Sequence, residues 1–261
     1  MEKGGVSTFK VAATYIGTVV GAGFATGQEI LQFFANFGIK GLAGLVLTSL
    51  LFAVFGYLVI DLGRILSARS HQEIIRYSAG PFLGRLIDWL TVFFLFGAFT
   101  TMLAGSGALT AQQFGWPPLA GCFIMGALAA ATVLRGIHTV INSISYVVPF
   151  LILSVAGTSL AALCQARPDF SVIPPAARQN ALFDHWLLSA LLYVSYNLIL
   201  SIAVLGPLGA HAAGRRAVKA GAIWGGLGLG AAAFMICLAI AAYYQQAALL
   251  EVPMMQIAGM I

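Results

Sequence analysis

Long apolar runs separated by short polar segments extend along almost the whole chain. The runs repeatedly exceed the roughly 20 residues with which an α-helix crosses a bilayer. The pattern therefore predicts an all-α polytopic membrane protein, with a single transmembrane domain over residues 1–261. Its seven predicted spans cover about residues 8–37, 42–66, 86–112, 118–134, 140–164, 185–208 and 218–244. Residues Pro253 to Ile261 then look like the start of an eighth helix.

The first predicted span carries a glycine-rich stretch at a depth where a membrane helix should be continuous. The stretch consists of Gly21, Ala22, Gly23, Phe24, Ala25, Thr26 and Gly27, followed by Gln28 and Glu29. Because exposed backbone at bilayer depth is tolerated only where protein buries it or a water-filled cavity receives it, we predict a broken helix that faces a cavity. A first half-helix would end near Val20, residues 21–25 would be unwound, and a new helix would start at Gly27.

Two side chains of this stretch predict how the new helix begins. Thr26 followed three residues later by Glu29 fits the capping box, in which each side chain satisfies a backbone donor at a helix start. A helix N-terminus inside the membrane aims N–H groups at the cavity, so we predict that residues 21–27 bind a solute carboxylate. Glu29 is either only the reciprocal cap of Thr26 or a proton- or ion-coupling group. Gly21 and Gly23 can alternatively serve close helix packing.

The sixth predicted span offers polar side chains for the opposite wall of this site. Four of them recur every four residues and therefore share one helix face: Ser189, Tyr193, Asn197 and Ser201. With Tyr196 beside this face, we predict that the solute site is lined by Tyr193, Tyr196, Asn197 and Ser201. Hydrogen bonding between helices is the alternative explanation. Thr101 and Ser106 of the third span are further candidates for the cavity wall, where tight helix packing is again the alternative.

Composition excludes several classes of protein. Hydrophobic residues make up 60% of the chain and charged residues 8%, far from the roughly 25% charged residues of an average soluble domain. The net charge of +5 does not indicate nucleic-acid binding, because the basic residues are spread over loops rather than gathered in a patch. The chain has no nucleophile–base motif, phosphate loop or metal-ligand spacing, so we expect no enzyme, no metal and no cofactor other than a coupling ion.

Charge placement predicts the orientation in the membrane. With a cytoplasmic N-terminus, ten basic residues fall on the inner side: Lys3, Lys10, Arg64, Arg69, Arg76, Arg85, Arg135, Arg215, Arg216 and Lys219. Three fall on the outer side: Lys40, Arg167 and Arg178. This asymmetry fits the positive-inside rule. We further expect residues 67–81 to form an amphipathic inner loop at the membrane surface, and ion pairs of Asp61 with Arg64 and of Asp88 with Arg85.

Four segments resemble the YkvI-type bacterial membrane proteins: Lys10 to Glu29, Met102 to Ala108, Asn142 to Pro149 and Tyr193 to Asn197. That family is similar to the amino acid–polyamine–organocation transporters. The resemblance implies a LeuT-like fold of two inverted five-helix repeats, with broken first and sixth helices and the substrate between them. The repeats would be residues 8–165 and an incomplete 185–261. Topology agrees, since the sixth span enters from the side opposite to the first, as inverted repeats require.

In the sixth span, the Gly206–Pro207 pair suits a kink or helix end.

The sequence departs from that fold in its length. The fold has ten core helices, whereas this chain reaches only the start of the eighth, so we expect a truncated member. An association with a chain that supplies the missing helices stays open. Sodium-coupled relatives share an ion site between the first and eighth helices, and some proton-coupled relatives place a lysine in the fifth. The fifth span here has no lysine but Asn142, Ser143 and Ser145, which leaves both Na⁺ and H⁺ as coupling ions.

The prediction for function is a secondary active transporter, an ion-coupled symporter or exchanger, of an amino acid or similar small organic solute. Its partners would be that solute and the lipid bilayer of the bacterial cytoplasmic (inner) membrane, with no nucleic acid. Two alternatives remain, a receptor or sensor subunit that does not transport and an inactive truncated remnant of a transporter. The resemblance supplies no particular substrate.

Overall fold

The computed structural model describes residues 5–173, 183–247 and 252–261, and these residues form helices without any β-strand. Five helices are long and apolar enough to cross a membrane: α4 (Ile39–Ile65), α5 (His71–Phe114), α7 (Ile137–Gln165), α8 (Trp186–His211) and α9 (Arg215–Ala242). The apolar helix α6 (Pro118–Leu134) is shorter, with 17 residues. The predicted all-α membrane protein is confirmed at this level. The seven-span count, the repeats and the orientation stay predictions, and Lys3 and Arg178 lie outside the described residues.

The first apolar run is interrupted, as its glycines predict. It forms α1 (Thr8–Val19), α2 (Ala22–Ala25), α3 (Gln28–Phe33) and the short 3₁₀ helix η1 (Ala35–Phe37). The helix is broken at residues 20–21 and again at residues 26–27. The predicted unwound segment 21–25 is therefore only partly right, because residues 22–25 form one helical turn. Gly27 has a φ of 79°, which favours glycine, and a Cβ there would come within 2.8 Å of the Met254 side chain.

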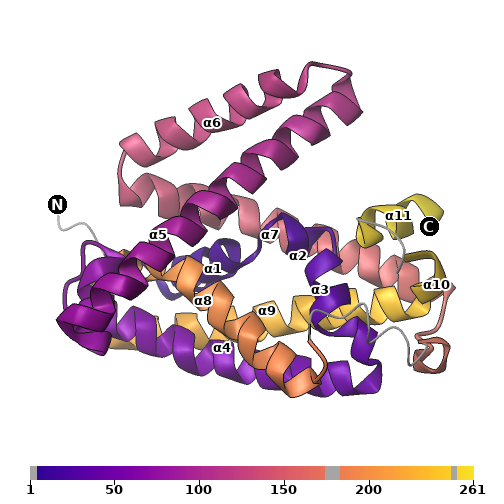
Figure 1. The fold of residues 1–261 in the computed structure, drawn as a ribbon, viewed down its shortest axis with the longest axis horizontal. Coiled ribbons are helices and arrows are strands. Elements are labelled where there is room, and N and C mark those ends of the chain that lie inside the picture. The colour runs from indigo at the N-terminus through magenta and orange to yellow at the C-terminus, as the bar shows by residue number, and fades with distance from the viewer. Residues whose placement is uncertain (1–4, 174–182, 248–251) are drawn as a thin grey trace.

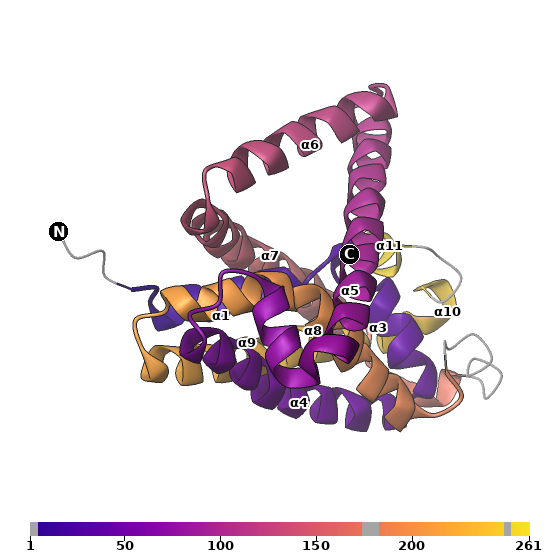
Figure 2. The same cartoon turned by 60° about the vertical axis from the view of Figure 1, so that its left-hand side comes forward.

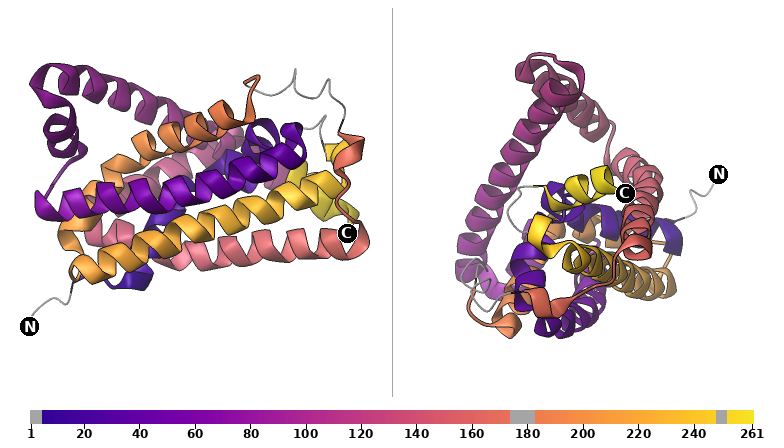
Figure 3. Two further views of the ribbon diagram at one scale, coloured as in Figure 1. Left: turned by 90° about the horizontal axis from the view of Figure 1, so that it is seen from below. Right: turned by 90° about the vertical axis from the view of Figure 1, so that its right-hand side faces the viewer.

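Four elements form the packed body of the protein, namely α1, α4, α8 and α9, which lie side by side along the long axis (Figures 1 and 3). Small residues allow the close approach. Tyr15 of α1 fills the space beside Gly56 of α4 and donates its hydroxyl to the Phe52 carbonyl at 2.7 Å. At Gly226 of α9 a side chain would collide with the backbone of Ala53. Interfaces of this kind are typical of membrane helices.

Helix α8 is continuous from Trp186 to His211, so the predicted break of the sixth helix is wrong. Its polar side chains bond to carbonyls of their own preceding turn, Asn197 to Tyr193 at 3.0 Å and Ser201 to Asn197 at 2.6 Å. These bonds leave the helical backbone intact. Pro207 lies in the last turns, and the helix passes through it rather than ending there.

Helices α5 and α6 form a hairpin that projects away from this body (Figures 1 and 2). Only 6% of the most apolar stretch of α5 is buried, against 56% for α9. A bend at Gly80, with φ of 74°, separates the first turns of α5 from the rest. Those turns bury Ile74 and Ile75, and Ile74 fills the space beside Gly206 of α8. The apolar side of residues 67–81 therefore packs on α8, and their position at the membrane surface stays a prediction.

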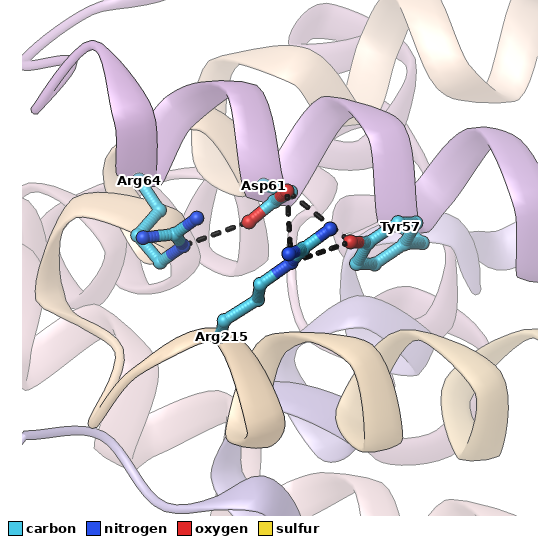
Figure 4. A network of polar contacts seen from close by, with 4 residues as sticks. All are labelled: Tyr57, Asp61, Arg64 and Arg215. Carbon is cyan, nitrogen blue, oxygen red and sulfur yellow. Dashed lines mark hydrogen bonds and ion pairs between the residues drawn. The ribbon is translucent and has the colours of Figure 1, made fainter.

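Polar contacts join the ends of helices near the N-terminus. The expected pair of Asp61 and Arg64 is confirmed, with Nε 2.7 Å from Oδ1, and Tyr57 donates to the other carboxylate oxygen at 3.2 Å (Figure 4). Arg215 from the start of α9 approaches that oxygen at 4.0 Å and donates to the Tyr57 hydroxyl at 3.3 Å. The network thus links α4 to α9.

Two further contacts lie in the same part of the fold. Val6, ahead of α1, pairs with Ala212 between α8 and α9, and its N–H donates to the His211 carbonyl at 2.8 Å. Asp88 lies 2.9 Å from His71 and accepts from Gln72 at 2.9 Å. The expected ion pair of Asp88 with Arg85 is wrong, because the bend in α5 brings the first turn of that helix next to Asp88.

Candidate functional site

A carboxylate lies where the interrupted first segment meets α8. Glu29, in the first turn of α3, accepts a hydrogen bond of 2.6 Å from the Tyr196 hydroxyl of α8. Gly23 of α2 makes room for it, since a Cβ at Gly23 would lie 2.7 Å from Cγ and 2.9 Å from Cδ of Glu29. Helices α2 and α3 of the interrupted segment and the distant helix α8 therefore converge on this side chain.

The predicted capping box is wrong. The residue that precedes α3 is Gly27, and no side chain caps the helix there. Thr26 instead donates its hydroxyl to the Gly23 carbonyl at 3.2 Å. The left-handed conformation of Gly27 starts the helix one residue later than the motif requires. The Glu29 side chain instead accepts the short hydrogen bond from the phenol of Tyr196.

Aromatic rings cluster around the two tyrosines next to the carboxylate. Phe33, one turn after Glu29 in α3, has its ring centre 5.6 Å from that of Tyr196 and 5.1 Å from that of Tyr193. Phe34 lies 5.0 Å from Tyr193 on another side. Spacings of this size are typical of favourable aromatic pairs. The rings form an aromatic frame around Tyr193 and Tyr196, the two tyrosines that interact with Glu29.

Tyr193 contributes a buried hydroxyl to the same place. Its side chain is fully buried, and the hydroxyl interacts with Glu29 and Tyr196. Among the described residues this hydroxyl nevertheless has no hydrogen bond of standard geometry. Buried polar groups normally have a partner, because burial without one costs free energy. The Tyr193 hydroxyl is therefore an exception, since it has no standard hydrogen bond among the described residues although it lies next to Glu29.

The other polar residues of the α8 stripe are buried but already bonded. Asn197 and Ser201 bond within α8, as described above. Ser189 donates its hydroxyl to the Phe33 carbonyl at 2.7 Å and so ties α8 to the end of α3. The stripe therefore serves two purposes, with Tyr193 and Tyr196 facing the carboxylate while Ser189, Asn197 and Ser201 stabilise the helices.

The interrupted segment uses some of its own backbone donors. The N–H of Ala25 bonds to the Gly21 carbonyl at 3.1 Å and that of Gly27 to the Phe24 carbonyl at 3.0 Å. These two donors are not available to a solute carboxylate in this conformation. Phe24 is buried, with 1% exposed. Ala22 begins α2, and Gly21 meets the Met102 side chain of α5.

A cavity of about 250 Å³ lies on the other side of the second break. It is lined by Ala25, Thr26, Ser154, Val155, Thr158, Val252, Met254, Met255 and Ala258. The N–H of Met254, in α11 (Pro253–Met260), donates to the Thr26 carbonyl at 2.9 Å. The start of the predicted eighth helix thereby closes one end of the interrupted segment.

The two candidates from the third span lie away from the break. Thr101 is exposed and donates to the Gly97 carbonyl of its own helix at 2.9 Å. Ser106 donates to the Met102 carbonyl at 2.9 Å and lines a separate cavity of about 380 Å³ between α5 and α6. The Met102 side chain of α5, in contrast, lies next to Gly21 at the first break.

Sequence reasoning missed Phe33 and Phe34 as parts of the site. They stand in an apolar run and carry no chemical signal of their own. Their one signal is spacing, since Phe33 follows Glu29 by four residues and therefore shares its helix face. Within the part of the chain that the structure describes, no group of three or more His, Cys, Asp or Glu side chains could hold a metal ion.

Comparisons with known proteins support the membrane assignment. The chain is 33% identical over 229 residues to the uncharacterized membrane protein YkvI of Bacillus subtilis (strain 168), covering 87% of this chain and 64% of the relative. It is 26% identical over 221 residues to the uncharacterized protein YyaD of the same organism, covering 84% and 62%. The chain therefore spans less than two thirds of the length of these curated relatives. No protein-family model matches it.

These similarities support the coarse part of the expected resemblance. The chain is a membrane protein homologous to YkvI. The relation to amino acid–polyamine–organocation transporters stays a prediction.

Proposed function

We propose that the chain is part of a secondary active transporter for an amino acid or a similar small organic solute in the bacterial cytoplasmic membrane. One observation carries the proposal, namely that Glu29 meets Tyr196 of α8 at 2.6 Å directly after the break in the first segment. Ionisable groups inside membrane proteins are costly, and they commonly mark substrate or ion pathways. The break supplies small residues and the aromatic frame supplies a shaped apolar wall beside the carboxylate.

The chemistry of the site suits a solute with an ammonium group. A carboxylate pairs strongly with a cation that also donates hydrogen bonds. Aromatic faces such as those of Phe33 and Tyr193 favour a cation by about 0.5–2 kcal/mol. The Tyr193 hydroxyl offers an additional polar contact. The solute carboxylate would then face the remaining N–H groups of residues 21–27, as the broken helix predicts.

Transport requires that the site opens to each side of the membrane in turn. In this conformation the contacts of Val6 with Ala212 and the network around Asp61 hold the helix ends nearest the N-terminus together. The proposed orientation puts these ends in the cytoplasm. Opening toward the cytoplasm would separate these helix ends. Glu29 would then give up its hydrogen bond with Tyr196 and bind the solute and the coupling ion, H⁺ or Na⁺.

Counterflow into proteoliposomes tests the proposal. The purified chain, reconstituted and loaded with a mixture of unlabelled amino acids, is screened with radiolabelled amino acids, with and without Na⁺ and pH gradients. We expect accumulation of at least one of them. Glu29→Gln should reduce it more than tenfold, because the neutral amide loses the charged pair with the solute.

A matched control is Glu73→Gln, an exposed carboxylate in the first turn of α5. It should transport like the unmodified protein. Binding without counterflow would indicate a receptor or sensor subunit instead. Neither binding nor counterflow would indicate an inactive remnant, and either result would overturn the transporter proposal.

A further inference from the structure

A third cavity, of about 420 Å³, lies between the start of α1 and the first turns of α7. It is lined by Phe9, Lys10, Asn142, Ser145, Tyr146, Pro149 and Phe150. None of these residues belongs to the site around Glu29. The Lys10 ammonium donates to the Asn142 side-chain carbonyl at 2.7 Å, which ties the two helices together at this end.

The lining changes from polar to apolar along α7. Asn142, Tyr146 and Phe150 follow one another at intervals of four residues and so lie in one row, about 12 Å long at 1.5 Å per residue. Ser145 and Pro149 form the neighbouring row. The charged end of the groove lies next to the starts of both helices, where a membrane helix meets water. Its apolar end lies toward the middle of α7.

The aromatic residues of the groove are uncovered. Phe9 is 63% exposed, Tyr146 is 76% exposed and Phe150 is 74% exposed. In a membrane protein such rings face lipid. The groove between the helices is also fixed in shape, because Gly17 of α1 packs directly on Ile144 and Val148 of α7.

We propose that this groove binds an anionic phospholipid, with its phosphate at Lys10 and an acyl chain along Pro149 and Phe150. The ammonium group has three donors, and Asn142 takes one of them. Among the residues that the structure describes, no acidic side chain lines the cavity to repel the phosphate. The predicted orientation places this end in the cytoplasmic leaflet. A free phosphate would contact only the charged end of the groove, at Lys10. A phospholipid would also contact the apolar end, at Pro149 and Phe150.

Lipid binding by the 261-residue chain, purified and delipidated in detergent, tests this site. Native mass spectrometry and thermal unfolding are measured against phosphatidylglycerol, phosphatidylcholine and inorganic phosphate. We expect phosphatidylglycerol to bind and raise the unfolding temperature more than phosphatidylcholine does. Lys10→Gln should weaken its binding about fivefold, the effect of one basic side chain near an anionic headgroup.

The controls separate this site from general charge effects. Lys40→Gln removes an exposed lysine at the start of α4 and should leave binding unchanged, and Lys10→Arg should retain it. Phe150→Ala should also weaken binding about fivefold, because the acyl chain loses an apolar contact. The Phe150 side chain is exposed, so its removal should not destabilise the fold. Equal affinity of Lys10→Gln and the unmodified chain, equal loss in Lys40→Gln, or full competition by inorganic phosphate would each overturn the proposal.

Discussion

Gly23 leaves the space that the Glu29 side chain occupies, so the substitution Gly23→Ala tests the site directly. The added methyl group would lie 2.7 Å from Cγ and 2.9 Å from Cδ of Glu29, closer than carbon atoms approach one another. The carboxylate must therefore move, and its bond of 2.6 Å with Tyr196 must lengthen or break.

The size of the effect follows from that bond. Hydrogen bonds to charged groups contribute about 1.5–3 kcal/mol in proteins, and polar pairs between membrane helices at most about 1.7 kcal/mol. We therefore expect Gly23→Ala to lower the free energy of unfolding by about 1–2 kcal/mol. Alanine also favours a helix over glycine by about 0.5–1 kcal/mol, which partly offsets the loss. Gly157→Ala in α7, where the added carbon meets no atom within 4 Å, measures this helix term alone.

A double-mutant cycle distinguishes this mechanism from general crowding. Tyr196→Phe removes the same hydrogen bond without adding volume, and should cost about 1–2 kcal/mol. If Gly23→Ala acts by breaking the bond, the double variant loses little more than either single variant. Chemical unfolding in detergent micelles gives the four free energies. Strictly additive losses would refute the reasoning, because the two changes would then act on different interactions.

Two further predictions concern the backbone and the polar network. Gly27→Ala should destabilise the protein by about 1–2 kcal/mol, because φ of 79° is strained for alanine and Met254 stands in the way. Gly136→Ala, with φ of 91° but open space around it, should lose less in the same unfolding measurement, and an equal loss would show that Met254 plays no part. Asp61→Asn should cost about 1 kcal/mol through the lost pair with Arg64, measured by thermal unfolding in low salt, and an unchanged midpoint would contradict it.

The hydrophobic pattern alone determined the class of this protein and most of its helices. Helices occupy the predicted ranges 42–66, 118–134, 140–164 and 218–244 to within a few residues, because apolar length is what a membrane span requires. The interruption near Gly21 and Gly27 was likewise visible, since glycine and polar residues are unusual inside such a run. These features depend on local composition, which the sequence states directly.

Tertiary structure decided the partners of the polar side chains. Glu29 fitted a local capping motif, yet a tyrosine 167 positions away provides a better hydrogen bond. Asp88 fitted a local pair with Arg85, yet the bend at Gly80 brings His71 and Gln72 to it. Local spacing shows which contacts are possible within one helix, and it cannot show which distant group competes for the same atom.

The third and sixth spans show the same limit for whole helices. The sequence marked Thr101 and Ser106 as cavity candidates, but Thr101 is exposed and bonds within its own helix, and Ser106 lines a separate cavity between α5 and α6. Helix α8 was expected to break, but it is continuous, and Asn197 and Ser201 bond to carbonyls of their own preceding turns. Apolar length and the positions of glycines along the chain were enough to predict where helices form and where the first one is interrupted. Which helix faces meet depends on packing and burial, and these compare groups from the whole chain at once.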